Sequence, residues 1–274
     1  MAAPRTAATA PAAASSTRGP RRGRLSHSMR WTLRLASVAV IGVAWQVYGS
    51  QNPLLLSDPA AVAGAFADMV SDGTLGQGLT ASLEVLGIGF GSGAVAGVLI
   101  GLVAGRSEVA AAVLEVPVNA LYAVPAVALI PVIVLWFGFA VTTKAIVVLL
   151  FVVFPVLINT MRGVREVDPD LVEVARSFSS SERRMWIDLI LPSALPYIVT
   201  GLRLAVGRAL IGVIVAEYYT SLSGLGNLIA TNASNFQTAR MFVPVVVIAA
   251  LGVILTALLE LAERRLAQWR KATP

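Results

Sequence analysis

Four ionisable side chains lie inside long apolar stretches of this 274-residue chain: Glu84, Arg203, Arg208 and Glu217. If these stretches cross a membrane, each charge is costly and therefore either lines a solute or ion pathway or forms a structural pair. Arg208 and Glu217 share one stretch and are candidates for a polar pathway. For Glu84 and Arg203 the sequence favours a structural pair or a position near a membrane surface.

Residues for enzymatic chemistry are scarce. His27 is the single histidine and cysteine is absent, so the chain offers no histidine or cysteine cluster that could bind a metal ion. No serine, histidine and aspartate set for nucleophilic catalysis is evident. A phosphate-binding loop requires Gly-x4-Gly-Lys-Ser/Thr, and neither Lys144 nor Lys271 follows a glycine. We therefore expect no enzymatic activity, no metal and no cofactor in this chain.

The composition predicts an all-α, polytopic membrane protein. Hydrophobic residues make up 57% of the chain and charged residues 13%, whereas soluble domains are about 45–50% apolar and about 25% charged. A membrane-spanning helix needs about 20 mostly apolar residues. Six segments meet or approach this length: Trp31–Tyr48, Leu79–Ala104, Val116–Phe137, Lys144–Met161, Ala194–Tyr218 and Phe242–Ala262.

The distribution of basic residues predicts how these segments are oriented in the membrane. If the N-terminus lies inside, seventeen of the 21 lysines and arginines fall on the inner side, and only Lys144 and Arg240 fall on the outer side. Cytoplasmic segments carry the excess of lysine and arginine, so both termini are expected in the cytoplasm of a cell-membrane protein. Residues 1–29 are rich in small and polar residues and are expected to form a disordered basic tail.

Glycine and proline predict how the spans pack. Small residues recur every fourth position from Gly93 to Gly105, which allows another helix to approach closely. Prolines in or beside the third and fourth segments predict kinked helices: Pro117, Pro125, Pro131 and Pro155. Broken backbone at membrane depth must face protein or a water-filled cavity. We therefore expect a translocation path near these spans, with four candidate residues: Tyr122, Asn159, Arg208 and Glu217.

The predicted cytoplasmic loop 162–193 reads as two short helices. Asp168 can cap the first, Pro169 suits its first position, and Leu171, Ala175 and Phe178 form a narrow apolar face. A second helix is expected to begin at Ser179, which has capping-box spacing to Glu182, and to end at Pro192. Its expected apolar side consists of Met185, Trp186, Leu189 and Ile190. Such a loop could dock on a soluble partner. Nucleic acid is an unfavourable partner, because the helices are short and lie against the bilayer.

The same loop resembles a known family. Glu173-Val174-Ala175, three residues, Ser179, nine residues and Leu189-Ile190-Leu191-Pro192 resemble the "E-A-A, three residues, G, nine residues, I-x-L-P" loop of ABC importer permeases. Ser179 replaces a glycine, which would adopt a left-handed turn more easily. Flanking segments such as "YAVPAVALIPVIVLWFGFA" and "SGLGNLI" are similar to the nitrate, sulfonate and taurine branch, and the resemblance covers roughly Leu79 to Trp269.

The resemblance implies a transport subunit. It implies cytoplasmic ATPase subunits that carry ATP and Mg²⁺, an extracytoplasmic solute-binding protein, membrane lipid around the chain, and a permease homodimer or a second permease. The implied organisation is a tail (1–29), a first span and external loop (30–78), a permease domain (79–264) and a cytoplasmic tail (265–274). The ATPase-coupling residues would be Glu173, Ala175, Arg176, Phe178, Ser179, Ser180 and Ser181.

Two questions stay open from the sequence. A secondary transporter or channel that uses Glu84 and Glu217 is the alternative to an ATP-driven importer, because ion coupling requires an ionisable group inside the membrane. The solute is the second question. A small anion such as nitrate, taurine or another sulfonate is expected, and Arg203 and Arg208 agree with an anion.

Overall fold

The computed structural model describes residues 26–52, 55–220 and 223–266, and within these ranges the chain is helical and contains no strand. Internal contacts divide the chain into two units, with the boundary between Ala44 and Trp45. The first unit contributes most of helix α1, His27–Gln51. Most of the predicted tail (residues 1–29) lies outside the described residues, and its last three residues belong to this helix.

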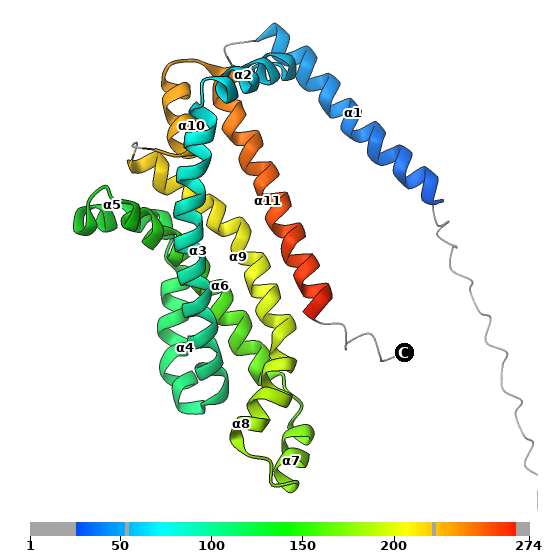
Figure 1. Ribbon diagram of the computed structural model, residues 1–274, viewed down its shortest axis with the longest axis vertical. Helices are drawn as coiled ribbons and strands as arrows, with labels where there is room; N and C mark the ends of the chain where they lie inside the picture. The colour runs from blue at the N-terminus through cyan, green and yellow to red at the C-terminus, as the bar shows by residue number, and fades with distance from the viewer. Residues whose placement is uncertain (1–25, 53–54, 221–222, 267–274) are drawn as a thin grey trace, which may run out of the picture. The chain divides into compact units, whose positions relative to one another are not determined.

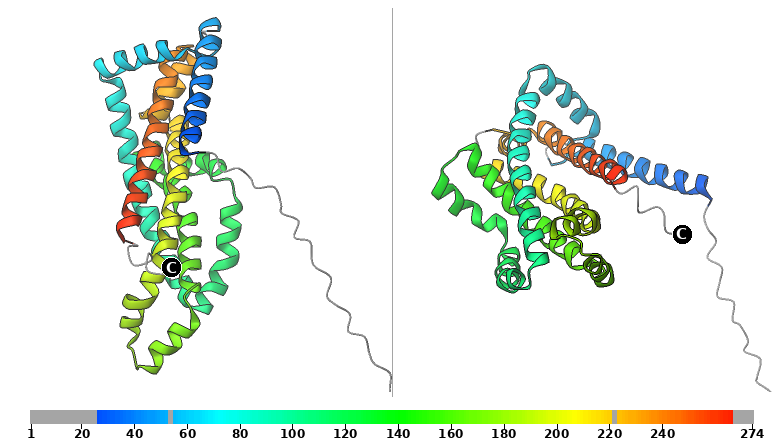
Figure 2. Two further views of the ribbon diagram at one scale, coloured as in Figure 1. Left: turned by 90° about the vertical axis from the view of Figure 1, so that its right-hand side faces the viewer. Right: turned by 60° about the horizontal axis from the view of Figure 1, so that its bottom comes forward.

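The second unit is a bundle of helices (Figures 1 and 2). In chain order its remaining elements are α2 Pro59–Ser71, α3 Thr74–Arg106, α4 Glu108–Ala123, α5 Ala126–Phe137, α6 Val141–Arg165, α7 Pro169–Ser177, α8 Glu182–Arg184, the π-helix η1 Met185–Ile190, α9 Leu191–Thr220, α10 Leu225–Ser234 and α11 Thr238–Leu266.

Five of the described helices are long and apolar enough to span a membrane, and a sixth span is possible if α4 and α5 count as one. These helices contain all six predicted segments, so the prediction of an all-α, polytopic membrane protein is confirmed. The third segment differs in form: α4 and α5 meet at an angle of 94°.

The break lies where a proline was expected to kink the chain. Pro125 is the N-cap residue of α5, and Val124 before it is extended, with φ −70° and ψ 127°. A residue that precedes proline is driven out of the helical region, because the proline ring clashes with it. Pro131 and Pro155 lie inside α5 and α6 without such a break.

The glycine stripe of α3 packs against α6. A Cβ atom added to Gly93 would lie 2.9 Å from Val152 Cβ, and one added to Gly97 would lie 2.8 Å from Val156 Cβ. The same pairing continues at four-residue intervals along both helices, with glycines at 89, 93, 97, 101 and 105 opposite Val148, Val152, Val156, Thr160 and Val164. The predicted helix-packing role of the stripe is thereby confirmed.

The core of the bundle lies between α3, α6 and α9, where Val85, Val152, Val156 and Ala209 are buried. The helix α11 packs on α9 (Figure 1), and Leu251 and Leu255 of α11 border this core. A second core joins α2, α10 and α11 at the end of the bundle opposite α7. Leu225 of α10 is completely buried there.

The short helices α2 and α10 were not predicted. Asp58 caps α2 by accepting hydrogen bonds from the amides of Ala60 and Ala61, and these bonds hold the pKa of Asp58 below its usual value. Asp72 ends the same helix and pairs with Arg240 at 3.3 Å. The first turn of α11 is thereby fixed to the segment between α2 and α3.

Candidate functional site

The hairpin formed by α7 and α8 projects from one end of the bundle (Figures 1 and 2). Its first helix begins as predicted: Asp168 Oδ1 accepts a hydrogen bond of 2.9 Å from the Asp170 amide, and Pro169 occupies the first position. Met185 and Ile190 are buried at the base of the hairpin, and Trp186 and Leu189 pack beside them. The predicted cap and the predicted apolar side of the second helix are confirmed.

The turn between the two helices differs from the prediction. Ser179 does not cap the second helix; it adopts a left-handed conformation with φ 52°, which favours glycine. The N-cap residue is Ser181, whose hydroxyl accepts a hydrogen bond of 3.4 Å from the Arg184 amide. The predicted start at Ser179 is wrong by two residues, because Ser179 is needed to reverse the chain.

Pro192 does not end the second helix. The chain passes from α8 through η1 into α9 without interruption, and Leu191 donates its amide hydrogen to Trp186 O, five residues earlier. A proline in an α-helix clashes with the preceding turn. The wider π turn before Pro192 relieves this clash, which explains why the predicted stop does not occur.

One face of α7 is apolar and uncovered. Leu171 is 51% exposed, Val174 52% and Phe178 83%, and their spacing places them on one side of the helix. Val172 and Ala175 are half-buried. Leu171 and Phe178 therefore lie on the apolar face as predicted, and Val174 takes the place predicted for Ala175.

Other predicted coupling residues border this face. Glu173, Arg176 and Ser181 are exposed and Ser180 is half-buried. Arg106 at the end of α3 pairs with Glu182 at 3.4 Å, which joins the bundle to the hairpin. The coupling role itself stays a prediction.

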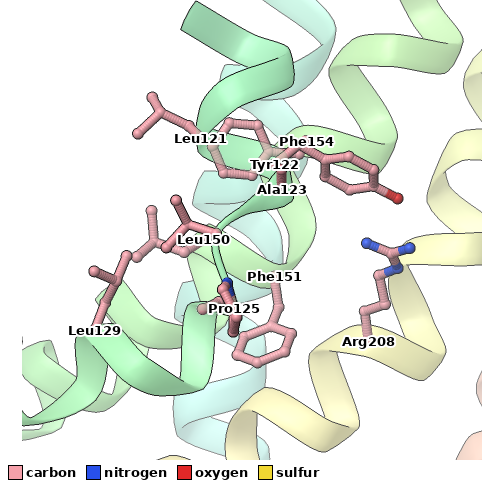
Figure 3. Close-up of a pocket in the computed structure, with 11 residues that line it drawn as sticks. Leu121, Tyr122, Ala123, Pro125, Leu129, Leu150, Phe151, Phe154 and Arg208 are labelled. Atoms are coloured by element: carbon pink, nitrogen blue, oxygen red, sulfur yellow. The ribbon is translucent and has the colours of Figure 1, made fainter.

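Two of the four path candidates meet in a cavity of about 290 Å³ (Figure 3). The break between α4 and α5 forms one wall, and α6 and α9 form the others. The Arg208 guanidinium carbon lies 4.9 Å from the centre of the Tyr122 ring. Phe154 packs on the other side of this tyrosine, with ring centres 6.1 Å apart.

Asn159 and Glu217 lie outside the lining of this cavity. Asn159 is half-buried between α6 and α9, faces Gly201, and donates a hydrogen bond of 2.7 Å to Pro155 O. Glu217 is completely buried near the end of α9. The structure therefore divides the predicted path residues into one pair in the cavity and two separate packing positions.

Glu217 joins three helices. Its carboxylate accepts hydrogen bonds from Ser82 Oγ in α3 at 2.8 Å and from the Gly226 amide in α10 at 2.8 Å. Ser82 Oγ in turn accepts a 2.8 Å hydrogen bond from the Leu225 amide. Gly224 has φ 104°, and a Cβ atom there would collide with the Glu217 carboxylate. These contacts hold the N-terminus of α10.

Sequence reasoning missed several members of this cluster. Ser82 lies 135 residues from Glu217 in the chain, so no spacing rule connects them. Lys144 is buried, and its Nζ donates to Ser223 Oγ at 3.1 Å and to Ser223 O at 3.3 Å. The glycines of "SGLGNLI" are the one available signal in the sequence. Glycine tolerates the positive φ of Gly224 and the close approach of the Glu217 carboxylate to its backbone.

The remaining charges inside the spans behave as structural groups. Arg203 of α9 pairs with Glu263 of α11, and the pair is partly buried. Glu84 is exposed, whereas Glu217 is completely buried, so the two carboxylates of the alternative ion-coupled transporter do not share one environment.

A helical membrane bundle that carries an exposed helical hairpin at one end, and a mostly apolar cavity with one arginine between its spans, has the architecture of a transport permease. Residues 97–268 match the family of binding-protein-dependent transport system inner membrane components, which is most of the chain. The chain belongs to this family. It is a multi-pass permease subunit of an ABC importer, a transport component and not an enzyme.

Relatives of known name agree with this family. The chain is 35% identical to a putative aliphatic sulfonates transport permease protein SsuC of Bacillus subtilis, over 88% of this chain and 89% of the relative. It is 38% identical to the protein of that name from Escherichia coli, over 89% of this chain and 95% of the relative.

A solved structure shares the fold. The chain is similar to a chain in the crystal structure of an amino acid ABC transporter with histidines, with a TM-score of 0.57. The match covers 73% of this chain and 98% of the other, at 22% identity.

Proposed function

We propose that this chain forms the membrane pathway of an ATP-driven importer for aliphatic sulfonates or closely related small anions. Two chains form a homodimer with their termini in the cytoplasm. Two cytoplasmic ATPase subunits bind ATP and Mg²⁺ and drive transport, and an extracytoplasmic binding protein delivers the solute.

The uncovered face of α7 carries the proposal. Leu171, Val174 and Phe178 expose apolar surface at the end of a hairpin, with Glu173 and Arg176 beside them. Apolar side chains that stand next to charges on one short helix match the composition of a protein interface, with an apolar centre and a polar rim. The ATPase subunit is the proposed partner that binds this face. In this family the energy for solute transport comes from a separate chain that hydrolyses ATP.

The homodimer is supported by the exposed face of α9. Leu204 and Ile211 are 55% and 54% exposed, and Gly207 and Arg208 are exposed between them. An arginine at mid-span must face protein or water, because contact with lipid is costly. A second copy that covers this face removes the cost.

The solute class is supported by the named relatives, both of which carry aliphatic sulfonates in their names.

Co-purification tests the coupling face. The permease and its ATPase are co-expressed, and the ATPase recovered on the tagged permease is measured for Phe178→Ala and for Phe236→Ala. Both phenylalanines are well exposed, at 83% and 77%, but Phe236 lies outside the hairpin, between α10 and α11. We expect Phe178→Ala to lower ATPase recovery by about tenfold or more, as for a central apolar contact, and Phe236→Ala to leave it unchanged.

A charge reversal gives a second test. Glu173→Arg should insert and fold normally, since Glu173 is exposed, but should weaken ATPase binding, because like charge replaces a carboxylate at the interface. Wild-type ATPase recovery and wild-type sulfonate uptake in both Phe178→Ala and Glu173→Arg would contradict the proposal that α7 is the coupling element.

A further inference from the structure

The cavity beside Arg208 has the size and chemistry of a small-ligand site. Its volume of about 290 Å³ lies just below the range for organic ligands, about 300–1,000 Å³, and suits a small one. Leu129, Leu150, Phe151 and Phe154 supply apolar walls, and Arg208 supplies the charge. Figure 3 shows the Tyr122 hydroxyl and the Arg208 guanidinium directed toward the same space.

Arg208 has no acidic partner among the described residues. The ion pairs found there involve Arg106, Arg162, Arg203 and Arg240. Arg203, five residues earlier on α9, is neutralised by Glu263. Arg208 instead stacks on the Tyr122 ring. A guanidinium without a counterion in a membrane-spanning helix is available to an anion, and its planar fork fits oxyanions with two parallel hydrogen bonds.

The broken span adds to this positive potential. Val124, Pro125 and Ala126 line the cavity, so the N-terminus of α5 opens onto it. The first amides of a helix lack partners inside the helix and carry its positive dipole end. The helix end alone would not define a site, but here it faces the same cavity as the unpaired guanidinium and the tyrosine hydroxyl.

We propose that this cavity is a binding site for one small organic sulfonate inside the membrane, with the sulfonate group on Arg208 and Tyr122 and the alkyl group against Phe151 and Phe154. This inference rests on the proposed function and deepens it. The binding protein selects the solute outside, and the cavity then holds the anion during its passage. A neutral solute of the same size would lack the charge that Arg208 requires.

The experiment uses the complete transporter, with permease, ATPase and binding protein, in proteoliposomes. Uptake of radiolabelled methanesulfonate and ethanesulfonate is measured beside ATP hydrolysis stimulated by the loaded binding protein. We expect Arg208→Gln to lower sulfonate uptake by about ten- to a hundred-fold, the effect of losing a charge-assisted hydrogen bond, while stimulated ATP hydrolysis stays within about twofold. Tyr122→Phe should lower uptake less, because the ring remains.

A matched pair of arginine variants provides the control. Arg208→Lys loses the planar fork and should reduce uptake several-fold, whereas Arg203→Lys keeps a cation opposite Glu263 and should leave uptake unchanged. Each variant must co-purify with the ATPase at wild-type yield, which separates a folding defect from a transport defect. Direct binding of labelled methanesulfonate to the permease–ATPase complex, measured without the binding protein, should weaken in Arg208→Gln and stay the same in Arg203→Lys.

Two outcomes would overturn the inference. Uptake at the wild-type level in Arg208→Gln would show that the cavity does not bind the transported anion. Equal loss of uptake and of stimulated ATP hydrolysis in a complex that assembles normally would assign Arg208 to coupling. Failure of the wild-type transporter to take up any sulfonate would instead contradict the proposed function.

Discussion

Ser179 shows how one residue sets the shape of the hairpin. Its φ of 52° costs about 1–2 kcal/mol for a residue that carries a Cβ atom. The strain is local, because Ser179 donates its amide hydrogen to Arg176 O at 2.8 Å and the next residue bonds to Ala175 O at 3.0 Å. The turn keeps its backbone hydrogen bonds, although a residue with a side chain is unfavourable in this left-handed conformation.

Replacement of Ser179 by glycine should therefore stabilise the chain. We expect Ser179→Gly to raise the free energy of unfolding by about 1 kcal/mol, since the left-handed strain disappears. Thermal unfolding of the detergent-solubilised protein measures the change. Ser92→Gly, inside α3, should lower stability by about the same amount, because glycine weakens a helix interior. Equal effects at the two positions would contradict the assigned conformation.

Glu217 is a second residue whose role is local. We expect Glu217→Ala to destabilise the chain by about 1–3 kcal/mol, because the Ser82 hydroxyl and the Gly226 amide lose their buried acceptor. The melting temperature in detergent checks this. Glu84→Ala, an exposed glutamate of α3, should change it little. A similar loss for both variants would argue against a special role of the buried carboxylate.

At the scale of elements, the α3–α6 contact depends on missing side chains. A Cβ atom at Gly97 would lie 2.8 Å from Val153 O and from Val156 Cβ, whereas Gly91 on the same helix has nothing within 4 Å. Backbone cannot move aside as a flexible side chain can, so the two helices would have to separate.

Alanine substitution distinguishes the two glycines. Gly97→Ala should destabilise the chain by about 1–3 kcal/mol through overpacking. Gly91→Ala should be neutral or stabilising by up to about 1 kcal/mol, because alanine favours the helix. Both variants are compared by thermal unfolding and by yield after membrane extraction. If Gly91→Ala were the more damaging substitution, the assigned packing face of α3 would be incorrect.

The elements differ in how far their sequence predicts them. The spans were predictable because each carries about 20 apolar residues in succession. The helices α2 and α10 have 13 and 10 residues, too short for that signal, and their burial depends on contacts with α11. Pro192 was misread because the rule for proline applies to α-helical geometry, and η1 supplies a wider turn.

At the scale of the whole molecule, orientation follows from charge and can be tested with unique thiols. The chain has no native cysteine, so single substitutions report unambiguously. Ser28→Cys and Ser177→Cys should be labelled only from the cytoplasmic side, and Ser234→Cys only from outside, because the arginine excess lies at the first two positions. A membrane-impermeant maleimide on intact cells and on inverted vesicles measures this. Labelling of Ser177→Cys in intact cells would reverse the assigned orientation.

The candidate site could be predicted only in part. The charged loop was found because its spacing is local, and Asp168, Pro169 and Met185 behave as their residue types indicate. The cavity required tertiary information, since Tyr122 and Arg208 lie on segments far apart in the chain and meet through the bend between α4 and α5. Asn159 and Glu217 were grouped with them because they are polar residues inside membrane-spanning segments. In the structure these two side chains lie at contacts between helices.

The uninterrupted helix from Glu182 to Thr220 has a mechanical consequence. At 1.5 Å per residue its 39 residues form a lever arm of roughly 58 Å, with the hairpin at one end and Arg208 about 39 Å along it. A tilt of about 5° at the hairpin would displace the guanidinium by roughly 3 Å at that radius. A hydrogen bond is lost over a much smaller displacement. Small rotations at the hairpin would therefore suffice to release an anion held at Arg208.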